Sequence, residues 1–113
     1  MKRGDVVVVA GGSGYTGKPR PAVILQSDVF HDLASVVVAP ITSVDSGTPL
    51  LRVPVEPDGL NGLRQPSFVM VDKITSVRRD KIGQRAGIVA PAVLARVGQA
   101  LQYFLALDEA AAS

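Results

Sequence analysis

Arginine, lysine and hydroxyl side chains are the groups with which this chain can do chemistry. Its 113 residues include no cysteine and one histidine, His31, against twelve Lys plus Arg. Without cysteine there is no thiolate nucleophile and no thiolate zinc site, and one histidine excludes a multi-histidine metal site within a chain. We interpret His31 as structural or exposed. The sequence therefore predicts no metal and no cofactor, and a reaction carried by Arg, Lys, Asp, Ser, Thr or Tyr.

The glycine-rich segment 12–17 resembles a nucleotide-binding loop only in its letters, G-S-G-Y-T-G. The dinucleotide motif needs a crossover helix, but four residues, two of them proline, separate this segment from the next strand. A P-loop is excluded as well, because Lys18 is followed by Pro19 instead of a hydroxyl residue. The segment predicts a hairpin loop in which Tyr15, Thr16 and Lys18 suit stacking of an unpaired base and contact with its phosphate. A hairpin end without function is the alternative.

Arg20 and Thr42 each stand where the side chain could contact a phosphate. Arg20 stands between Pro19 and Pro21, which restrict the backbone and present the guanidinium at the entrance of a strand. A guanidinium practically never gives up its proton, so Arg20 suits stabilisation of negative charge and not proton acceptance. Thr42 follows a predicted strand closed by Pro40, where its hydroxyl can bind a phosphate oxygen. A turn-capping hydroxyl is the alternative for Thr42.

The distribution of charge also favours contact with phosphate groups. The net charge is only +2, but eight of the twelve cations are arginine, and residues 52–85 hold seven cations against four acids. Arginine binds phosphate in a bidentate manner that lysine cannot match. This excess weakly favours a polyanionic partner, and a solvated basic face is the alternative.

The elements that must position these residues are short strands followed by one helix. Strand-like runs rich in β-branched residues cover 6–10, 22–26, 35–41, 50–55, 67–71 and 74–79, and residues 27–33 predict a short helical turn. From Pro91 onward the apolar residues fall at helical spacing. The fold class is therefore mainly β, a small, strongly bent antiparallel barrel with a carboxy-terminal amphipathic helix. We expect a single domain over 1–113, with a flexible tail at 108–113.

The chain shows no sign of a membrane span or of export. Its longest apolar run is about five residues, whereas a spanning helix needs about 20. Lys2 and Arg3 are followed by Gly4 and Asp5, which break the core of a signal peptide. We therefore expect a cytoplasmic protein that does not associate with a membrane.

Five short stretches give the chain a resemblance to the MazF/PemK family of toxin endoribonucleases. They are R-G-D-V-V at 3–7, K-P-R-P-A-V-I-L at 18–25, A-P-I-T-S at 39–43, V-D-K-I at 71–74 and G-I-V-A-P at 87–91. Each stretch alone is weak, but their order in a chain of this size is specific, and the resemblance covers residues 2–107.

The resemblance implies a fold, an activity and a set of site residues. The fold is an SH3-like barrel with a carboxy-terminal helix, shared with the gyrase poison CcdB, and the molecule is a homodimer. The family cleaves single-stranded RNA without metal, leaving a cyclic phosphate and a 5′-hydroxyl. Its catalytic pair falls on Arg20 and Thr42. Some members also use an aspartate, here Asp72, together with an arginine where this chain has Met70.

The remaining expectations concern binding partners. Tyr15, Thr16, Lys18, Ser43, Lys73 and Arg78 are the predicted RNA-binding residues. A cognate antitoxin would offer a disordered acidic segment that folds onto the basic surface. The proton acceptor stays unassigned between Asp72 and solvent. Two alternatives to an RNA-cleaving toxin remain at this point, a CcdB-like poison of DNA gyrase and a catalytically dead nucleic-acid-binding barrel.

Overall fold

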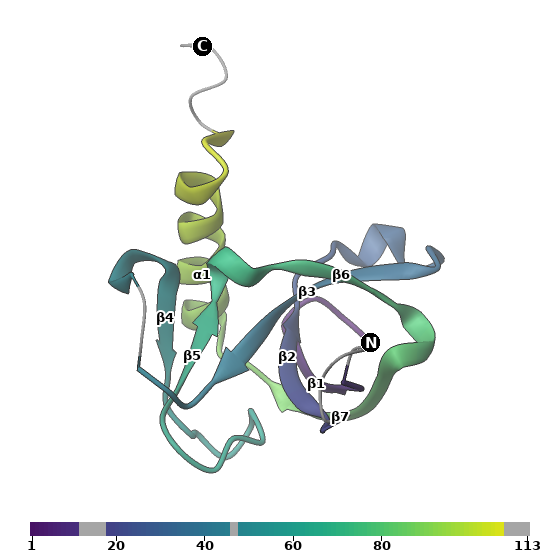
Figure 1. Ribbon diagram of the computed structural model, residues 1–113, viewed down its shortest axis with the longest axis horizontal. Coiled ribbons are helices and arrows are strands. Elements are labelled where there is room, and N and C mark those ends of the chain that lie inside the picture. Colours follow the sequence, from purple (N-terminus) through teal and green to yellow (C-terminus); the bar gives the residue numbers. More distant parts are fainter. Residues whose placement is uncertain (12–17, 46–47, 108–113) are drawn as a thin grey trace.

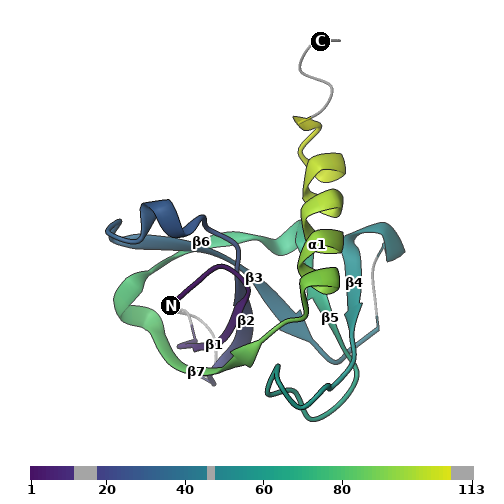
Figure 2. The ribbon, with the colours of Figure 1, turned by 180° about the vertical axis from the view of Figure 1, so that it is seen from behind.

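The computed structural model describes residues 1–11, 18–45 and 48–107 (Figure 1). Seven antiparallel strands form one strongly bent sheet in the order β4-β5-β3-β2-β1-β7, and β6 pairs with β3 beside this path. Figures 1 and 2 show β6 and β7 curling around β1, β2 and β3, while α1 lies at the β4–β5 end. The elements are β1 (Asp5–Val9), β2 (Arg20–Ile24), β3 (Ser35–Thr42), β4 (Arg52–Val55), β5 (Ser67–Met70), β6 (Thr75–Arg78), β7 (Ile82–Ile88) and α1 (Pro91–Phe104). The predicted mainly β barrel with a carboxy-terminal helix is confirmed.

Strand β3 joins the two halves of the sheet. Its residues Ser35–Val38 pair with β6, whereas Ile41 and Thr42 pair with Val69 and Phe68 of β5. Pro40, which lacks a backbone N–H, lies between these two ladders and stands opposite Ala22 of β2. The strand thus changes partner at its proline.

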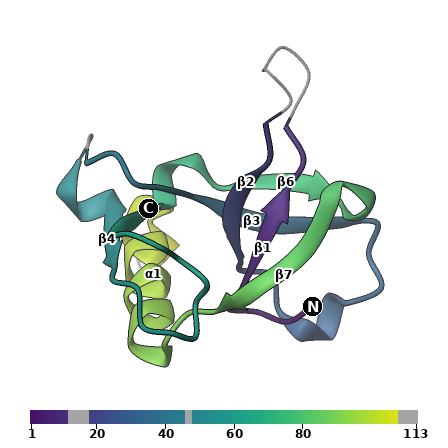
Figure 3. The same cartoon turned by 90° about the horizontal axis from the view of Figure 1, so that it is seen from below.

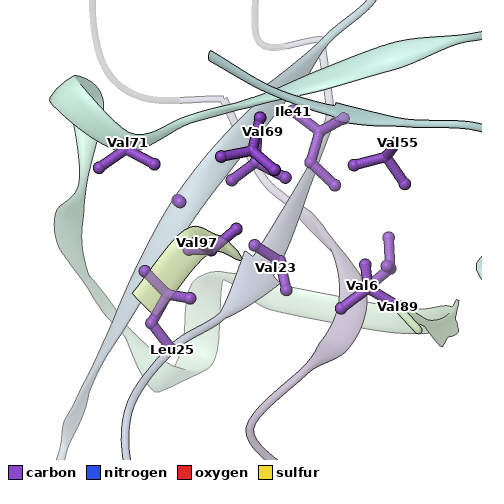
Figure 4. Close-up of a cluster of buried hydrophobic side chains, with 11 residues drawn as sticks. Val6, Val23, Leu25, Ile41, Val55, Val69, Val71, Val89 and Val97 are labelled. Atoms are coloured by element: carbon purple, nitrogen blue, oxygen red, sulfur yellow. The ribbon is translucent and has the colours of Figure 1, made fainter. Parts of the chain in front are cut away.

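The two faces of the sheet bury separate groups of apolar side chains, because successive residues of a strand point to opposite faces. One face packs against α1, where Val97 is fully buried, and this cluster is drawn in Figure 4. The other face fills the inside of the barrel. The first cluster contains Val6, Val23, Leu25, Ala39, Ile41, Val53, Val55, Val69, Val71, Val89 and Val97, and the second contains Val7, Ala22, Ile24, Val36 and Val38.

Strand β7 is the element that the sequence did not predict. Between Ile82 and Ile88 it reads G-Q-R-A-G, which has neither β-branched residues nor an alternating apolar pattern. It forms because β1 offers it a ladder, and two irregularities in register let it follow the curvature of the barrel. The other six strands lie where they were expected, within a few residues.

The predicted helical turn and the predicted place of His31 are both confirmed. Residues Asp28–Phe30 form a single 3₁₀ turn, and the Ser27 hydroxyl accepts a hydrogen bond from the Val29 N–H at 3.3 Å. His31 follows this turn and is exposed. The expected tail at 108–113 lies outside the described residues. In the described ranges, no helix combines the length and the hydropathy that crossing a membrane requires.

Two glycines allow the loop between β4 and β5 to dock on β7. The Ile88 N–H donates to the Leu60 carbonyl at 2.9 Å, and the neighbouring Asn61 is buried. A Cβ atom on Gly87 would lie 2.2 Å from the Leu60 oxygen, and one on Gly62 would lie 2.5 Å from the Ala86 oxygen. The two backbones therefore touch where only glycine leaves room.

At a third glycine, Gly98 in α1, no close backbone contact requires glycine. The atom nearest to a Cβ at this position is an Arg3 nitrogen at 3.9 Å, an ordinary contact distance. Because glycine inside a helix costs about 0.5–1 kcal/mol relative to alanine, we expect Gly98→Ala to raise the free energy of unfolding by about that amount. Urea denaturation followed by circular dichroism measures it, and an unchanged or lower midpoint would contradict the expectation.

Candidate functional site

A groove of about 790 Å³ opens over the inside of the barrel. One wall is the hairpin of β1 and β2, and the other is β6 with the turns on either side of it; Figure 3 shows both on the same side of the molecule. We call it the cationic groove. The described residues that line it are Val9, Ala10, Gly11, Lys18, Arg20, Pro21, Ala22, Val38, Pro40, Met70, Lys73, Thr75, Val77, Arg78 and Lys81.

The charge in the cationic groove is all of one sign among these lining residues. Five are cations, Lys18, Arg20, Lys73, Arg78 and Lys81, and none is a carboxylate. Within the described ranges, Arg78 alone among these cations has an ion pair, with Asp80, and both side chains are more than half exposed, so solvent weakens this attraction. Because the cations stand around an apolar floor, the groove offers both charge for phosphates and flat apolar surface for bases.

The register of β2 and β3 runs toward Arg20 at the start of β2 and Thr42 at the end of β3. Ala22 stands opposite Pro40, so continuing this antiparallel register by two residues places Arg20 opposite Thr42. Both side chains fall on the face that carries Ala22 and the floor of the cationic groove, because residues two apart on a strand share a face. Directly opposed residues have Cβ atoms about 5 Å apart, which is close enough for both to touch one phosphate.

Thr42 also has a local role. Its Oγ1 accepts a hydrogen bond from the Val44 N–H at 3.1 Å, the turn-capping contact that the sequence left as the alternative. Accepting this bond leaves the hydroxyl proton of Thr42 free to donate. The two roles are therefore compatible, although Thr42 is not one of the residues that line the cationic groove.

Asp72, the third predicted catalytic residue, forms an ion pair with an arginine. Its Oδ1 is 3.0 Å from Nη1 of Arg52, at the start of β4. Asp72 does not line the cationic groove, although Met70 and Lys73 on either side of it do. Arg52 stands directly opposite Met70 in the β4–β5 ladder, so an arginine lies on the strand next to the position where the family resemblance implies one in some members.

The predicted RNA-binding residues divide into three groups. Lys18, Lys73 and Arg78 line the cationic groove. Ser43 is exposed beyond the end of β3 and does not line it. Tyr15 and Thr16 lie outside the described residues. The sequence reasoning missed Lys81, which was counted in the cation-rich stretch 52–85 but could not be placed without β7.

The sequence and fold can now be compared with known proteins. A model of the PemK-like, MazF-like toxins of type II toxin–antitoxin systems matches residues 2–105. This chain belongs to that family. It is 43% identical over 107 residues to a probable endoribonuclease MazF of Mycolicibacterium smegmatis, covering 95% of this chain and 98% of the relative. It is also 35% identical over 88 residues to endoribonuclease MazF3 of Mycobacterium tuberculosis, covering 74% of this chain and 82% of the relative.

Solved structures of MazF proteins share the fold. The Mycobacterium tuberculosis toxin MazF-mt6 matches with a TM-score of 0.74 at 29% identity, over 89% of this chain and 96% of that one. An endoribonuclease from a mycobacterial species, solved in complex with its cognate antitoxin, matches with a TM-score of 0.78 at 26% identity, over 95% and 96%. The family resemblance and the prediction of an endoribonuclease toxin are thereby confirmed for this MazF-like chain.

Proposed function

We propose that this MazF-like toxin cleaves single-stranded RNA in the cytoplasm without a metal ion, at short sequences, and so inhibits translation and growth. The observation that carries the proposal is the cationic groove, with five cations, Arg20 among them, and no carboxylate among its described lining residues. The register of β2 and β3, continued past Ala22 and Pro40, sets Arg20 opposite Thr42. A phosphodiester that enters it meets a bidentate cation and a hydroxyl donor together. The rest of the groove serves to bind the strand.

Cleavage uses the 2′-hydroxyl of the RNA itself. The 2′-oxygen attacks the adjacent phosphorus, the bond to the 5′-oxygen of the next nucleotide breaks, and the products are a 2′,3′-cyclic phosphate and a 5′-hydroxyl. Arg20 stabilises the extra negative charge of the pentavalent transition state, and Thr42 donates a hydrogen bond to a phosphate oxygen. The proton of the 2′-hydroxyl passes to water and the 5′-oxygen takes one from solvent, so no step needs Asp72.

The floor of the cationic groove favours an unpaired strand. Its apolar side chains include Pro21, Pro40, Met70 and Val77, and unstacked bases bind to such surfaces in single-stranded RNA. In a duplex the bases stack on one another and face their partners, so the floor would stay uncovered. The specificity of cleavage therefore depends on which bases this floor and the neighbouring loops accept.

The same groove suits a protein inhibitor. The mycobacterial relative was solved with its cognate antitoxin. We propose an antitoxin for this chain too, with a disordered acidic segment whose carboxylates meet the five cations in place of phosphates. We also propose that the toxin is a homodimer, as the family resemblance implies. Sedimentation of the free toxin measures this state, and a monomer at micromolar concentration would contradict it.

The proposed function is tested by incubating the purified toxin with a long single-stranded RNA in excess EDTA. We expect discrete fragments that carry 5′-hydroxyl and cyclic phosphate ends, identified by end labelling and mass spectrometry. Replacing the nucleotide before each cut by its 2′-deoxy form should block cutting there. Arg20→Ala protein purified in the same way controls for contaminating nucleases. Cleavage that needs added metal, or that persists in this variant, would contradict the mechanism.

The role of Thr42 is tested by two substitutions, one that keeps the hydroxyl and one that removes it. Thr42→Ser keeps the donor and should retain cleavage within a few fold of the wild type. Thr42→Val keeps the shape, removes the donor, and should lower kcat by about tenfold to a hundredfold, since a hydrogen bond to a charged group contributes about 1.5–3 kcal/mol. Single-turnover cleavage of a short RNA measures both. Equal rates for the two variants would leave Thr42 only its turn-capping bond to Val44.

A further inference from the structure

We propose that Arg52 and Asp72 form a positioning pair that holds one wall of the cationic groove, and that Asp72 does not accept a proton in the reaction. This inference rests on the proposed function, because the wall matters only if the groove binds a nucleic-acid strand. It assigns a role to a side chain, Arg52, that lies outside the groove.

The wall in question is a single 3₁₀ turn, Val71–Lys73 (η3), between β5 and β6. Met70 before the turn, Lys73 within it and Thr75 after it all line the cationic groove. The two residues between Met70 and Lys73 point elsewhere: Val71 is fully buried in the core that packs against α1, and Asp72 pairs with Arg52. The turn is thus held at two points, by an apolar anchor and by an ion pair.

The ion pair is better sheltered than most at a protein surface. Arg52 has 9% of its side chain exposed and Asp72 has 28%, and the Asp72 Oδ1 that faces Arg52 is shielded from solvent. Loss of Arg52 would leave the part-buried Asp72 carboxylate without this ion pair, which is more costly than loss of an exposed pair. The turn would then relax, and Lys73 would move with it.

The geometry also separates Asp72 from the reacting phosphate. Arg20 begins β2 and lines the cationic groove, whereas Asp72 Oδ1 lies 3.0 Å from Nη1 of Arg52, at the start of β4. A general base must come within hydrogen-bonding distance of the proton that it removes. The pairing with Arg52 directs Asp72 Oδ1 toward β4, and Asp72 has no share in the lining of the groove.

The proposal is tested with Asp72→Asn, Asp72→Arg, Arg52→Asp and the exchanged pair Arg52→Asp/Asp72→Arg. Each is compared at a temperature where circular dichroism shows it folded. We expect either charge reversal alone to lower kcat/KM by about tenfold to a hundredfold, mainly through KM, because a displaced binding wall costs that much. The exchanged pair should recover most of the loss, since the two effects are coupled. Asp72→Asn should keep the acidic limb of the pH–rate profile.

The opposite results would overturn the inference. If Asp72 is the proton acceptor, Asp72→Asn flattens the acidic limb and lowers kcat at unchanged KM, and the exchanged pair stays as inactive as Asp72→Arg. Single variants with wild-type KM would also refute a positioning role.

Binding of a DNA oligonucleotide, which lacks the 2′-hydroxyl and cannot be cleaved this way, separates this inference from the proposed function. Weaker binding by Asp72→Arg that the exchange restores supports the positioning pair even if no RNA is cut. Equal binding by all four variants and the wild type contradicts it. If some variants fail to fold, the nearly isosteric Asp72→Asn still decides the question through its pH profile and KM.

Discussion

Arg20→Ala is expected to lower kcat/KM for RNA cleavage by about 10²–10³-fold, the usual effect of removing one group that stabilises transition-state charge. Of the five groove cations, Arg20 is the one in β2, where the register with β3, continued past Ala22 and Pro40, sets it opposite Thr42. Its side chain is exposed and no hydrogen bond or ion pair within the described residues holds it, so the folded state loses little. The measurement is single-turnover cleavage of a short RNA, with the melting temperature as a check on folding.

Two further variants sharpen this result. Arg20→Lys keeps the charge but loses the bidentate fork, and it should recover only a small part of the activity. Arg96→Ala removes an equally exposed arginine from α1, away from the cationic groove, and should cleave RNA like the wild type. Near-normal cleavage by Arg20→Lys would show that a point charge suffices and that the fork does not matter.

Gly87→Ala is expected to lower the free energy of unfolding by more than about 3 kcal/mol, in the range reserved for overpacked and strained sites. The added methyl group would lie 2.2 Å from the Leu60 oxygen and 2.6 Å from the Asn61 carbonyl carbon. Both are backbone atoms, so a change of side-chain rotamer cannot relieve the clash. Relief requires the loop to leave β7, which exposes the buried Asn61 and breaks the hydrogen bond from Ile88 to Leu60.

Gly98→Ala is the matched control, because the same methyl group is added where it meets nothing closer than 3.9 Å. Urea denaturation of the two variants should therefore shift in opposite directions. A Gly87→Ala protein that unfolds at the wild-type midpoint would mean that the loop and β7 separate at little cost. The close contact at Gly87 would then not hold this end of the barrel together.

The fold could be predicted from the sequence wherever side-chain pattern and backbone chemistry agree. The β-branched runs that became β1 and β3 bury alternate side chains in two cores, and Pro91 begins α1. Strand β7 could not be predicted in this way, because its residues carry almost no pattern of their own. Its conformation is imposed by pairing with β1, a strand about 75 positions earlier in the sequence.

The candidate site was predictable for single residues but not for their surroundings. Arg20, Lys18 and Lys73 could be selected by residue type and by resemblance, and all three line the cationic groove. Lys81 was missed because the turn before β7 was not expected. Arg52 was missed because the spacing of residues along the chain does not indicate an ion pair with a residue of a different element. Tertiary pairing, not local sequence, decides which cations share a surface.

The pairing of β1 with β7 has a consequence for when a newly made chain becomes harmful to its host. The cationic groove takes one wall from residues before 41 and the other from residues after 69, and the ladder between β1 and β7 ends at Ile88. A chain still emerging from the ribosome therefore lacks half of its RNA-binding surface, and pairings between strands so distant in sequence form late. Nuclease activity should arise only after nearly the whole chain is translated, so an antitoxin that is already present has time to bind.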